Sequence, residues 1–201
     1  MSIKAYSLKK QKNEHLSKNF TIEEFACRDG SDKILIDTKL VELLQKIRNH
    51  FGLPVTITSA YRTESYNIQI GGVAGSTHTK GIAADIFITE ITPNEIAAYI
   101  EYIMPDYGGI GLYSNFVHID VRSNRSRWKN YGSEIVVDGF YGYNPVDKTI
   151  QNPADAIDVL SDKAIINSPE IWYNGTWTGN DFKHLLIKFA NYVLQGKNND
   201  M

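Results

Sequence analysis

Three residues whose side chains commonly bind metal ions stand out by their local sequence: His78, Asp85 and His118. His78 lies in a stretch rich in Gly, Ser and Thr, whereas Asp85 and His118 lie in stretches that read as strands. Two neutral imidazoles and one carboxylate are a common ligand set for catalytic zinc, and they leave a fourth position for water. Bound zinc lowers the pKa of that water toward ~7 and polarises a carbonyl group under attack. The three residues therefore predict a hydrolytic zinc site; the alternative is that they are ordinary hydrogen-bonded side chains.

The sequences around these residues resemble those of one enzyme family. Residues 76–85 read STHTKGIAAD and resemble the Ser-x-His-x-x-Gly-x-Ala-x-Asp signature of the zinc D-alanyl-D-alanine carboxypeptidase and endopeptidase family. Residues 116–120, FVHID, look like the family's second zinc motif, and residues 59–63, SAYRT, resemble the stretch with its active-site arginine. Residues 25–30, FACRDG, and residues 108–111, GGIG, are similar to the branch that contains murein endopeptidases and phage lysins.

The resemblance implies a fold, a cofactor and a substrate. The fold is the α+β fold shared with hedgehog-type domains, and the substrate is a peptidoglycan stem peptide. By the same resemblance, His78, Asp85 and His118 hold a Zn²⁺ ion. Arg62 binds the terminal carboxylate of the substrate or a carbonyl near the scissile bond, which suits its planar donor fork. The alternative for Arg62 is a salt bridge with a nearby acid.

Three further residues are expected around the substrate. Ser76 either hydrogen-bonds the substrate backbone or orients His78, and a role as a loop cap is the alternative. Tyr113 and Trp128 are expected to line the substrate groove, with ordinary packing as the alternative.

The general base is where this sequence departs from the better-known family members. Some relatives place Glu or Asp three residues before the third ligand, and others place His two residues before it. Here these positions hold Asn115 and Phe116, which cannot accept a proton. Asp120 follows His118 on the same face of the strand and is the remaining candidate. The alternative, which stays open, is that Asp120 fixes the tautomer of a histidine ligand. Because positions 115 and 116 lack a proton acceptor, a second alternative also stays open: the protein is a non-catalytic module that binds peptidoglycan or forms part of a phage particle.

The elements that must position these residues follow from hydrophobic periodicity and capping patterns. Together they predict an α+β fold in which helices pack on a small antiparallel sheet. The expected helices lie at residues 37–51 and 92–104, with a short one within 19–29. The expected strands lie at residues 54–59, 84–89, 109–112 and 116–121, and the last two form a hairpin.

The character of the sequence changes after Trp128. We expect a zinc peptidase domain at residues 1–135, a linker at residues 136–153 and a small helical module at residues 154–201. The module carries an apolar helical stripe and several aromatic residues, so it either binds a cell-wall polymer or phage particle or seals its own small core.

Composition excludes several classes of protein. A formal net charge of -2 over 201 residues argues against a dedicated nucleic-acid binder, and no apolar run is long enough to span a membrane. A single cysteine, Cys27, rules out an intrachain disulfide and a cysteine-rich zinc site. The N-terminal residues lack the apolar segment of a signal peptide. We therefore expect an enzyme of phage or prophage origin. Release by lysis, or transport on a phage particle, would bring it to the cell wall without a signal peptide.

Overall fold

The computed structural model describes residues 3–143 and, beyond them, only Ser161, Ile166, Trp172, Asn174, Thr178, Gly179 and Asp181. The chain divides into two compact units, residues 1–143 and residues 144–201. The first unit continues past the expected boundary at residue 135 because Phe140 is buried in its core and donates its backbone N–H to Glu101. The linker from residue 144 onward and the helices expected in the C-terminal module lie outside the described residues.

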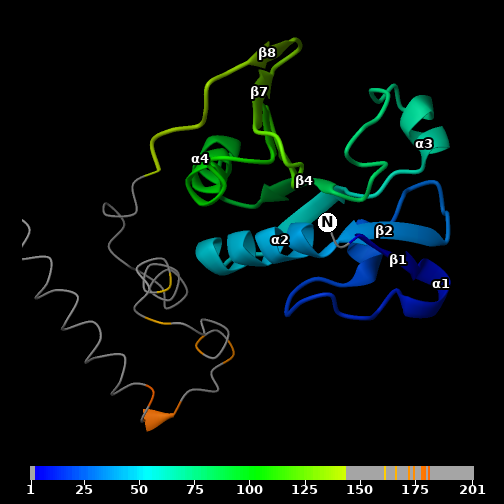
Figure 1. The fold of residues 1–201 in the computed structure, drawn as a ribbon, viewed down its shortest axis with the longest axis horizontal. Helices are drawn as coiled ribbons and strands as arrows, with labels where there is room; N and C mark the ends of the chain where they lie inside the picture. Colours follow the sequence, from blue (N-terminus) through cyan, green and yellow to red (C-terminus); the bar gives the residue numbers. More distant parts are fainter. Residues whose placement is uncertain are drawn as a thin grey trace, which may run out of the picture. The chain divides into compact units, whose positions relative to one another are not determined.

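Two β-sheets form the framework of the first unit (Figure 1). The small sheet pairs β1 (Ile3–Ser7) with β2 (Lys33–Asp37) in antiparallel register. The larger sheet has the strand order β3-β4-β6-β5-β7-β8, and its neighbouring strands are antiparallel except β5 and β7, which run parallel. Its strands are β3 (Val55–Ser59), β4 (Ala83–Ile88), β5 (Gly109–Tyr113), β6 (Val117–Asp120), β7 (Ser126–Asn130) and β8 (Glu134–Val136).

Both longer helices begin at an N-cap that the sequence provides, and α2 also ends at a glycine cap. α2 (Thr38–Phe51) starts after Asp37, whose carboxylate caps the first turn, and ends at Gly52 in the left-handed conformation. α4 (Pro93–Ile103) starts with a capping box at Thr92. The remaining helices are short: α1 (Leu8–Gln11), the 3₁₀ helix η1 (Ile22–Phe25) and α3 (Glu64–Gln69).

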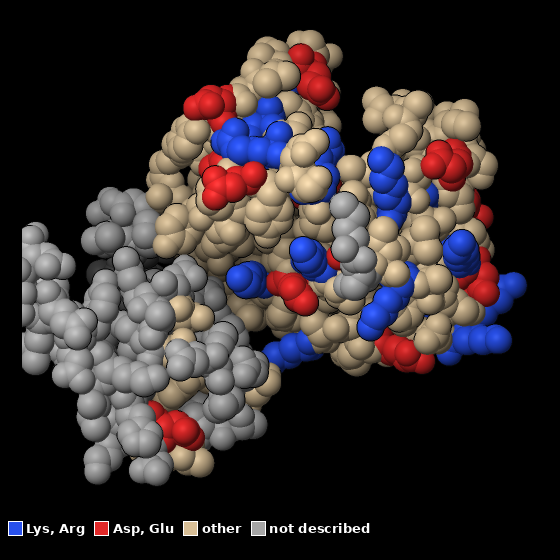
Figure 2. Space-filling view, in the orientation of Figure 1, with Lys and Arg blue, Asp and Glu red and all other residues tan. Residues whose placement is uncertain are grey.

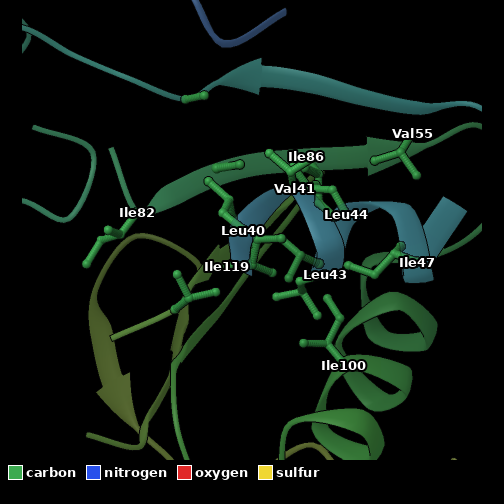
Figure 3. Packing of buried hydrophobic residues seen from close by; sticks show 14 of the residues in the cluster. Leu40, Val41, Leu43, Leu44, Ile47, Val55, Ile82, Ile86, Ile100 and Ile119 are labelled. Carbon is green, nitrogen blue, oxygen red and sulfur yellow. The ribbon is translucent and has the colours of Figure 1, made fainter. Parts of the chain in front are cut away.

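The apolar core lies between the helices and one face of the larger sheet. Figure 3 shows Leu44 of α2 together with Ile86 of β4 and Ile119 of β6, and all three are fully buried. Burial of each such side chain contributes roughly 1.5–3 kcal/mol. Because side chains alternate along a strand, the neighbours Asp85 and His118 must point to the opposite face of the sheet. The core thereby fixes which residues are presented for chemistry.

The expected α+β class is confirmed, and the larger sheet differs from the expectation in one respect. It is mixed rather than wholly antiparallel, because β7 returns beside β5 in the parallel direction. The sequence did not predict β7 and β8, and it also missed the small sheet and α3. Within the part of the chain that the structure describes, no helix has the length and apolarity needed to cross a membrane.

Candidate metal centre

One row of residues crosses the larger sheet on the face opposite the helices. Paired strand by strand, the row is Ser59, Asp85, His118, Gly111 and Trp128. Gly111 is required because a Cβ atom at this position would lie 2.4 Å from the indole of Trp128. The glycine lets the indole pack directly on β5, next to the imidazole of His118, with the ring centroids 5.2 Å apart.

His78 joins this row from the loop that precedes β4. The loop turns at Gly81, where φ is +70° and a Cβ atom would lie 2.4 Å from the carbonyl oxygen of Leu35. The turned loop is held by the backbone N–H of Arg62, which donates to the carbonyl of His78 at 3.2 Å. The side chain of His78 is consequently buried beside Asp85 and faces the sheet.

The three expected ligands converge to a spacing slightly shorter than that of a tetrahedral zinc site. Nε2 of His78 lies 3.2 Å from Nδ1 of His118 and 3.3 Å from Oδ1 of Asp85. Nδ1 of His118 and Oδ1 of Asp85 are 2.9 Å apart. Zinc bonds of ~2.0–2.2 Å place the ligand atoms of a tetrahedron about 3.3–3.6 Å from one another. The donor set is therefore close to the size of a zinc ion's coordination shell, and the residues fit Zn²⁺ as the cofactor.

Hydrogen bonds behind the two imidazoles select which nitrogen faces the centre. Nδ1 of His78 is 2.7 Å from the carbonyl oxygen of Ala60, an acceptor only, so Nδ1 carries the proton and Nε2 is left as a ligand. Nε2 of His118 is 3.2 Å from Oδ2 of Asp120, which leaves Nδ1 of His118 to face the centre. Such partners orient a metal ligand and increase its basicity.

Asp120 lies on the far side of His118 from the convergent ligand atoms. Its carboxylate is fully buried and accepts the backbone N–H of Gly109 at 3.1 Å and Nε of Arg122 at 2.7 Å. A Cβ atom at residue 109 would lie 2.3 Å from Oδ2 of Asp120, so the glycine makes room for the carboxylate. Between the two roles left open by the sequence, this placement favours a residue that orients His118 over a proton acceptor in the pocket.

Burial and hydrogen bonding act in opposite directions on the pKa values of the centre. Burial opposes charge on His118, but hydrogen bonds with Asp120 and Asp85 outweigh it and raise the pKa of His118 to about 9. Burial lowers the pKa of His78. Burial also works to raise the pKa of both carboxyl groups, but hydrogen bonds, chiefly with His118, hold these pKa values well below the usual range. A bound cation must therefore displace a proton from His118.

Arg62 and Ser76 have partners within the protein. Nη2 of Arg62 pairs with Oδ2 of Asp85 at 2.8 Å, and Nε donates to Oγ of Ser59 at 2.8 Å. This is the salt bridge that the sequence left as the alternative, and it fixes the carboxylate whose other oxygen faces the centre. Oγ of Ser76 accepts the backbone N–H of His78 at 3.3 Å, which fits the role of a loop cap.

The metal centre opens into a pocket of about 830 Å³ that both Arg62 and Ser76 also line. One wall is the loop of residues 71–77, and the other includes Tyr113 and Trp128. Figure 2 shows the surface hollowed between the part that carries α3 and the part that carries β7 and β8. Both aromatic residues thus lie where a substrate groove was expected.

Three charged residues of the pocket escaped the sequence analysis: Lys80, Arg122 and Glu134. Arg122 follows Asp120 at the spacing that places two side chains on one face of an extended chain, and this signal was available. Lys80 lies within the zinc motif but at one of its variable positions. Glu134 gave no signal, because it reaches the pocket only through the unpredicted hairpin of β7 and β8.

Comparison with known proteins agrees with this geometry. A family model described as Peptidase M15 matches residues 18–120, about half of the chain, and the match includes His78, Asp85 and His118. No curated protein matches the chain significantly. The protein belongs to the Peptidase M15 family of zinc-dependent metallopeptidases.

Proposed function

We propose that this metallopeptidase hydrolyses an amide bond in the stem peptide of bacterial peptidoglycan, as a lysin or wall-remodelling enzyme. The observation that carries the proposal is the buried group of His78, Asp85 and His118, whose ligand atoms are 2.9–3.3 Å apart at a pocket of about 830 Å³. Zn²⁺ bound there supplies Lewis-acid polarisation of the scissile carbonyl and a water of lowered pKa.

The chain's own residues hold this centre in its reactive form. Asp120 keeps the proton of His118 on Nε2, and the carbonyl of Ala60 keeps the proton of His78 on Nδ1. Arg62 holds Oδ2 of Asp85 so that Oδ1 stays turned to the centre. We assign Arg62 and Asp120 to positioning the ligands, with the remaining guanidinium N–H groups of Arg62 available to a substrate carbonyl or carboxylate.

The proton acceptor of the reaction is assigned to Glu134. Among the described residues, the carboxylates that line the pocket are Asp85 and Glu134, and Asp85 is committed to Arg62 and both histidines. Glu134 forms no ion pair with any described residue and lies on β8 at the pocket rim. An uncommitted carboxylate that lines the pocket can accept a proton from water and return it to the leaving amine.

The charges of the pocket suit a stem peptide, which carries both carboxylate and amino groups. Of the cations lining the pocket, Arg62 and Arg122 are paired with Asp85 and Asp120. Lys80 forms no ion pair with any described residue, so it is available to a substrate carboxylate. A terminal carboxylate there would give carboxypeptidase activity, whereas a side-chain carboxylate is compatible with endopeptidase activity.

Mass spectrometry of muropeptides before and after treatment tests the proposal, with His78→Ala as the matched inactive control. We expect one new product mass that requires added Zn²⁺ and is absent with the control variant. Binding to purified peptidoglycan without any product would instead support the non-catalytic alternative. The position of the cleaved bond separates the carboxypeptidase and endopeptidase reactions.

We further propose that the protein acts at the bacterial cell wall and derives from a phage or prophage. Support comes from residues 25–30 and 108–111, which resemble the murein endopeptidase and phage lysin branch. Residues 144–201 are proposed to contact a wall polymer or a phage particle. Co-sedimentation of the full chain and of residues 1–143 with purified cell walls tests this role, because only the full chain should bind if the module targets the enzyme.

A further inference from the structure

We propose that the hydroxyl group of Tyr113 donates a hydrogen bond to the carbonyl oxygen of the scissile amide, and that Trp128 orients this hydroxyl. The inference deepens the proposed function, since it assigns a catalytic residue to the same pocket. In amide hydrolysis negative charge develops on the carbonyl oxygen, and a rigid donor aimed at it stabilises the transition state more than the substrate.

The phenol ring of Tyr113 is fixed at the end of β5. Its ring stacks on Phe116 with centroids 4.2 Å apart and an interplanar angle of 12°. The backbone N–H of Tyr113 donates to the carbonyl of Phe116 at 3.1 Å, which closes the hairpin between β5 and β6. Residue 113 lies on the same face of β5 as Gly109 and Gly111, which is the face of the metal centre. The ring therefore lines the pocket in one defined position.

A hydrogen bond from Trp128 determines whether the hydroxyl of Tyr113 donates or accepts toward the pocket. The indole N–H can only donate, and Nε1 of Trp128 lies 3.2 Å from the phenol oxygen of Tyr113. The phenol oxygen accepts this bond, which leaves its own O–H free to donate. No described residue accepts that proton, and Tyr113 is among the residues that line the pocket. The indole of Trp128 packs on Gly111 beside the metal ligand His118, so it fixes the position of the Tyr113 hydroxyl relative to the metal centre.

Tyr113 has few rivals as a rigid donor in this pocket. Arg122 is engaged by the buried carboxylate of Asp120, and Lys80 is an exposed side chain. Arg62 keeps N–H groups for the substrate, but it approaches from the side of Asp85, to which its Nη2 is bound. Burial raises the pKa of Tyr113, so its hydroxyl keeps the proton at neutral pH. A neutral donor also adds no further charge to a pocket that already contains the cationic Lys80 and the ligands for Zn²⁺.

The test compares Tyr113→Phe, Trp128→Phe and the wild-type enzyme loaded with Zn²⁺. Tyr113→Phe removes one oxygen atom, and we expect kcat to fall by ~10²-fold while KM changes by less than about threefold. Trp128→Phe keeps an aromatic ring but removes the indole N–H, and we expect a smaller loss of kcat in the same direction. Tyr131→Phe is the matched control, because Tyr131 is 59% exposed and is not among the residues that line the pocket.

Binding provides a second readout that does not require turnover. A phosphinate isostere of alanyl-alanine mimics the tetrahedral state, and Tyr113→Phe should weaken its binding by about the factor lost in kcat. Zinc content should be unchanged in every variant. A Tyr113→Phe enzyme whose kcat and phosphinate affinity stay within twofold of the wild type would overturn the inference. If the wild type binds the phosphinate but cleaves no muropeptide, the proposed substrate is wrong, and the binding comparison still decides the role of Tyr113.

Discussion

Replacement of Asp120 by Asn separates the two roles that a carboxylate at this position can have. The substitution keeps the shape of the side chain but replaces one acceptor oxygen with an N–H donor. Oδ1 can still accept the backbone N–H of Gly109, whereas the new amide faces Nε2 of His118 and the guanidinium of Arg122. Two donors then face each other unless His118 moves its proton to Nδ1, the atom that should bind zinc.

The expected size of the effect follows from these contacts. Because the tautomer suited to zinc loses its partner, we expect zinc affinity to fall by ~10- to 100-fold. Stability should also fall, because hydrogen bonds to a charged group contribute ~1.5–3 kcal/mol each. The side chain of Arg122 is 36% exposed and can turn to solvent, so we expect a total loss of about 2–3 kcal/mol.

Competition titration with a chelating indicator measures the zinc affinity of Asp120→Asn, and urea unfolding of the metal-free protein measures its stability. Turnover is then recorded at zinc concentrations that saturate the variant. Ser123→Ala, a substitution at the rim of the same pocket, serves as the control and should leave both quantities unchanged. A variant that binds zinc normally but turns over 10²-fold more slowly would refute the reasoning and identify Asp120 as the proton acceptor. Normal zinc affinity together with normal turnover would exclude both roles.

Four other outcomes are expected. His78→Ala should lose Zn²⁺ in elemental analysis, because two remaining ligands rarely retain it. Glu134→Gln should lower turnover by ~10²-fold with full zinc occupancy, and unchanged turnover would exclude Glu134 as the proton acceptor. Gly111→Ala should destabilise the protein by ~1–3 kcal/mol in urea unfolding, because the new methyl group overlaps the indole of Trp128. In the metal-free protein His118 has a pKa raised from 6.5 to about 9, so the stabilisation from its charge is complete below pH 6.5. Urea unfolding with chelator should therefore show the stability falling by on the order of 3 kcal/mol as the pH rises through 9, and a flat profile would contradict the assignment.

The metal centre was largely predictable from the sequence because its ligands come from local motifs. Strand alternation alone places His118 and Asp120 on one face, and the short loop before β4 brings His78 back toward Asp85. The structure brings the three expected ligands together, and the helices expected before residue 105 and the four expected strands occur close to their predicted bounds. Each motif and each element depends on residues that are near one another in the chain, and only the meeting of His118 with the other two ligands joins distant residues.

The rest depends on contacts between distant residues, which periodicity does not report. The pairing of Arg62 with Asp85 requires β3 and β4 to be neighbours, whereas the sequence analysis favoured a substrate carboxylate or carbonyl as the partner of Arg62. β7 was missed because its pairing with β5 and β8 makes it a strand, and its residues lack an apolar alternation. The same pairing brings Trp128 onto Gly111, so the pocket wall could not be built before the topology was known.

The strand that completes the pocket is held from both of its faces. Trp128 points to the metal centre, and its neighbour Arg127 points the other way into the core. The side chain of Arg127 is fully buried, pairs with Glu101 of α4 at 2.6 Å and donates to the carbonyl of Gly108 at 2.6 Å. An ion pair buried at this depth requires several hydrogen bonds to offset its desolvation, and here they come from the carbonyls next to β5.

This arrangement divides the site into two parts with different origins in the chain. The metal ligands lie within residues 18–120, the range matched by the family model, whereas Arg122, Trp128 and Glu134 follow it. The family therefore accounts for how the centre binds zinc and activates an amide. Recognition by the pocket is shared: Lys80 and Tyr113 lie within the matched range, and the segment after residue 120 adds Trp128 and the uncommitted carboxylate of Glu134. Substitutions in this segment should change substrate preference while leaving zinc affinity intact, with Arg122 as the exception because it holds Asp120.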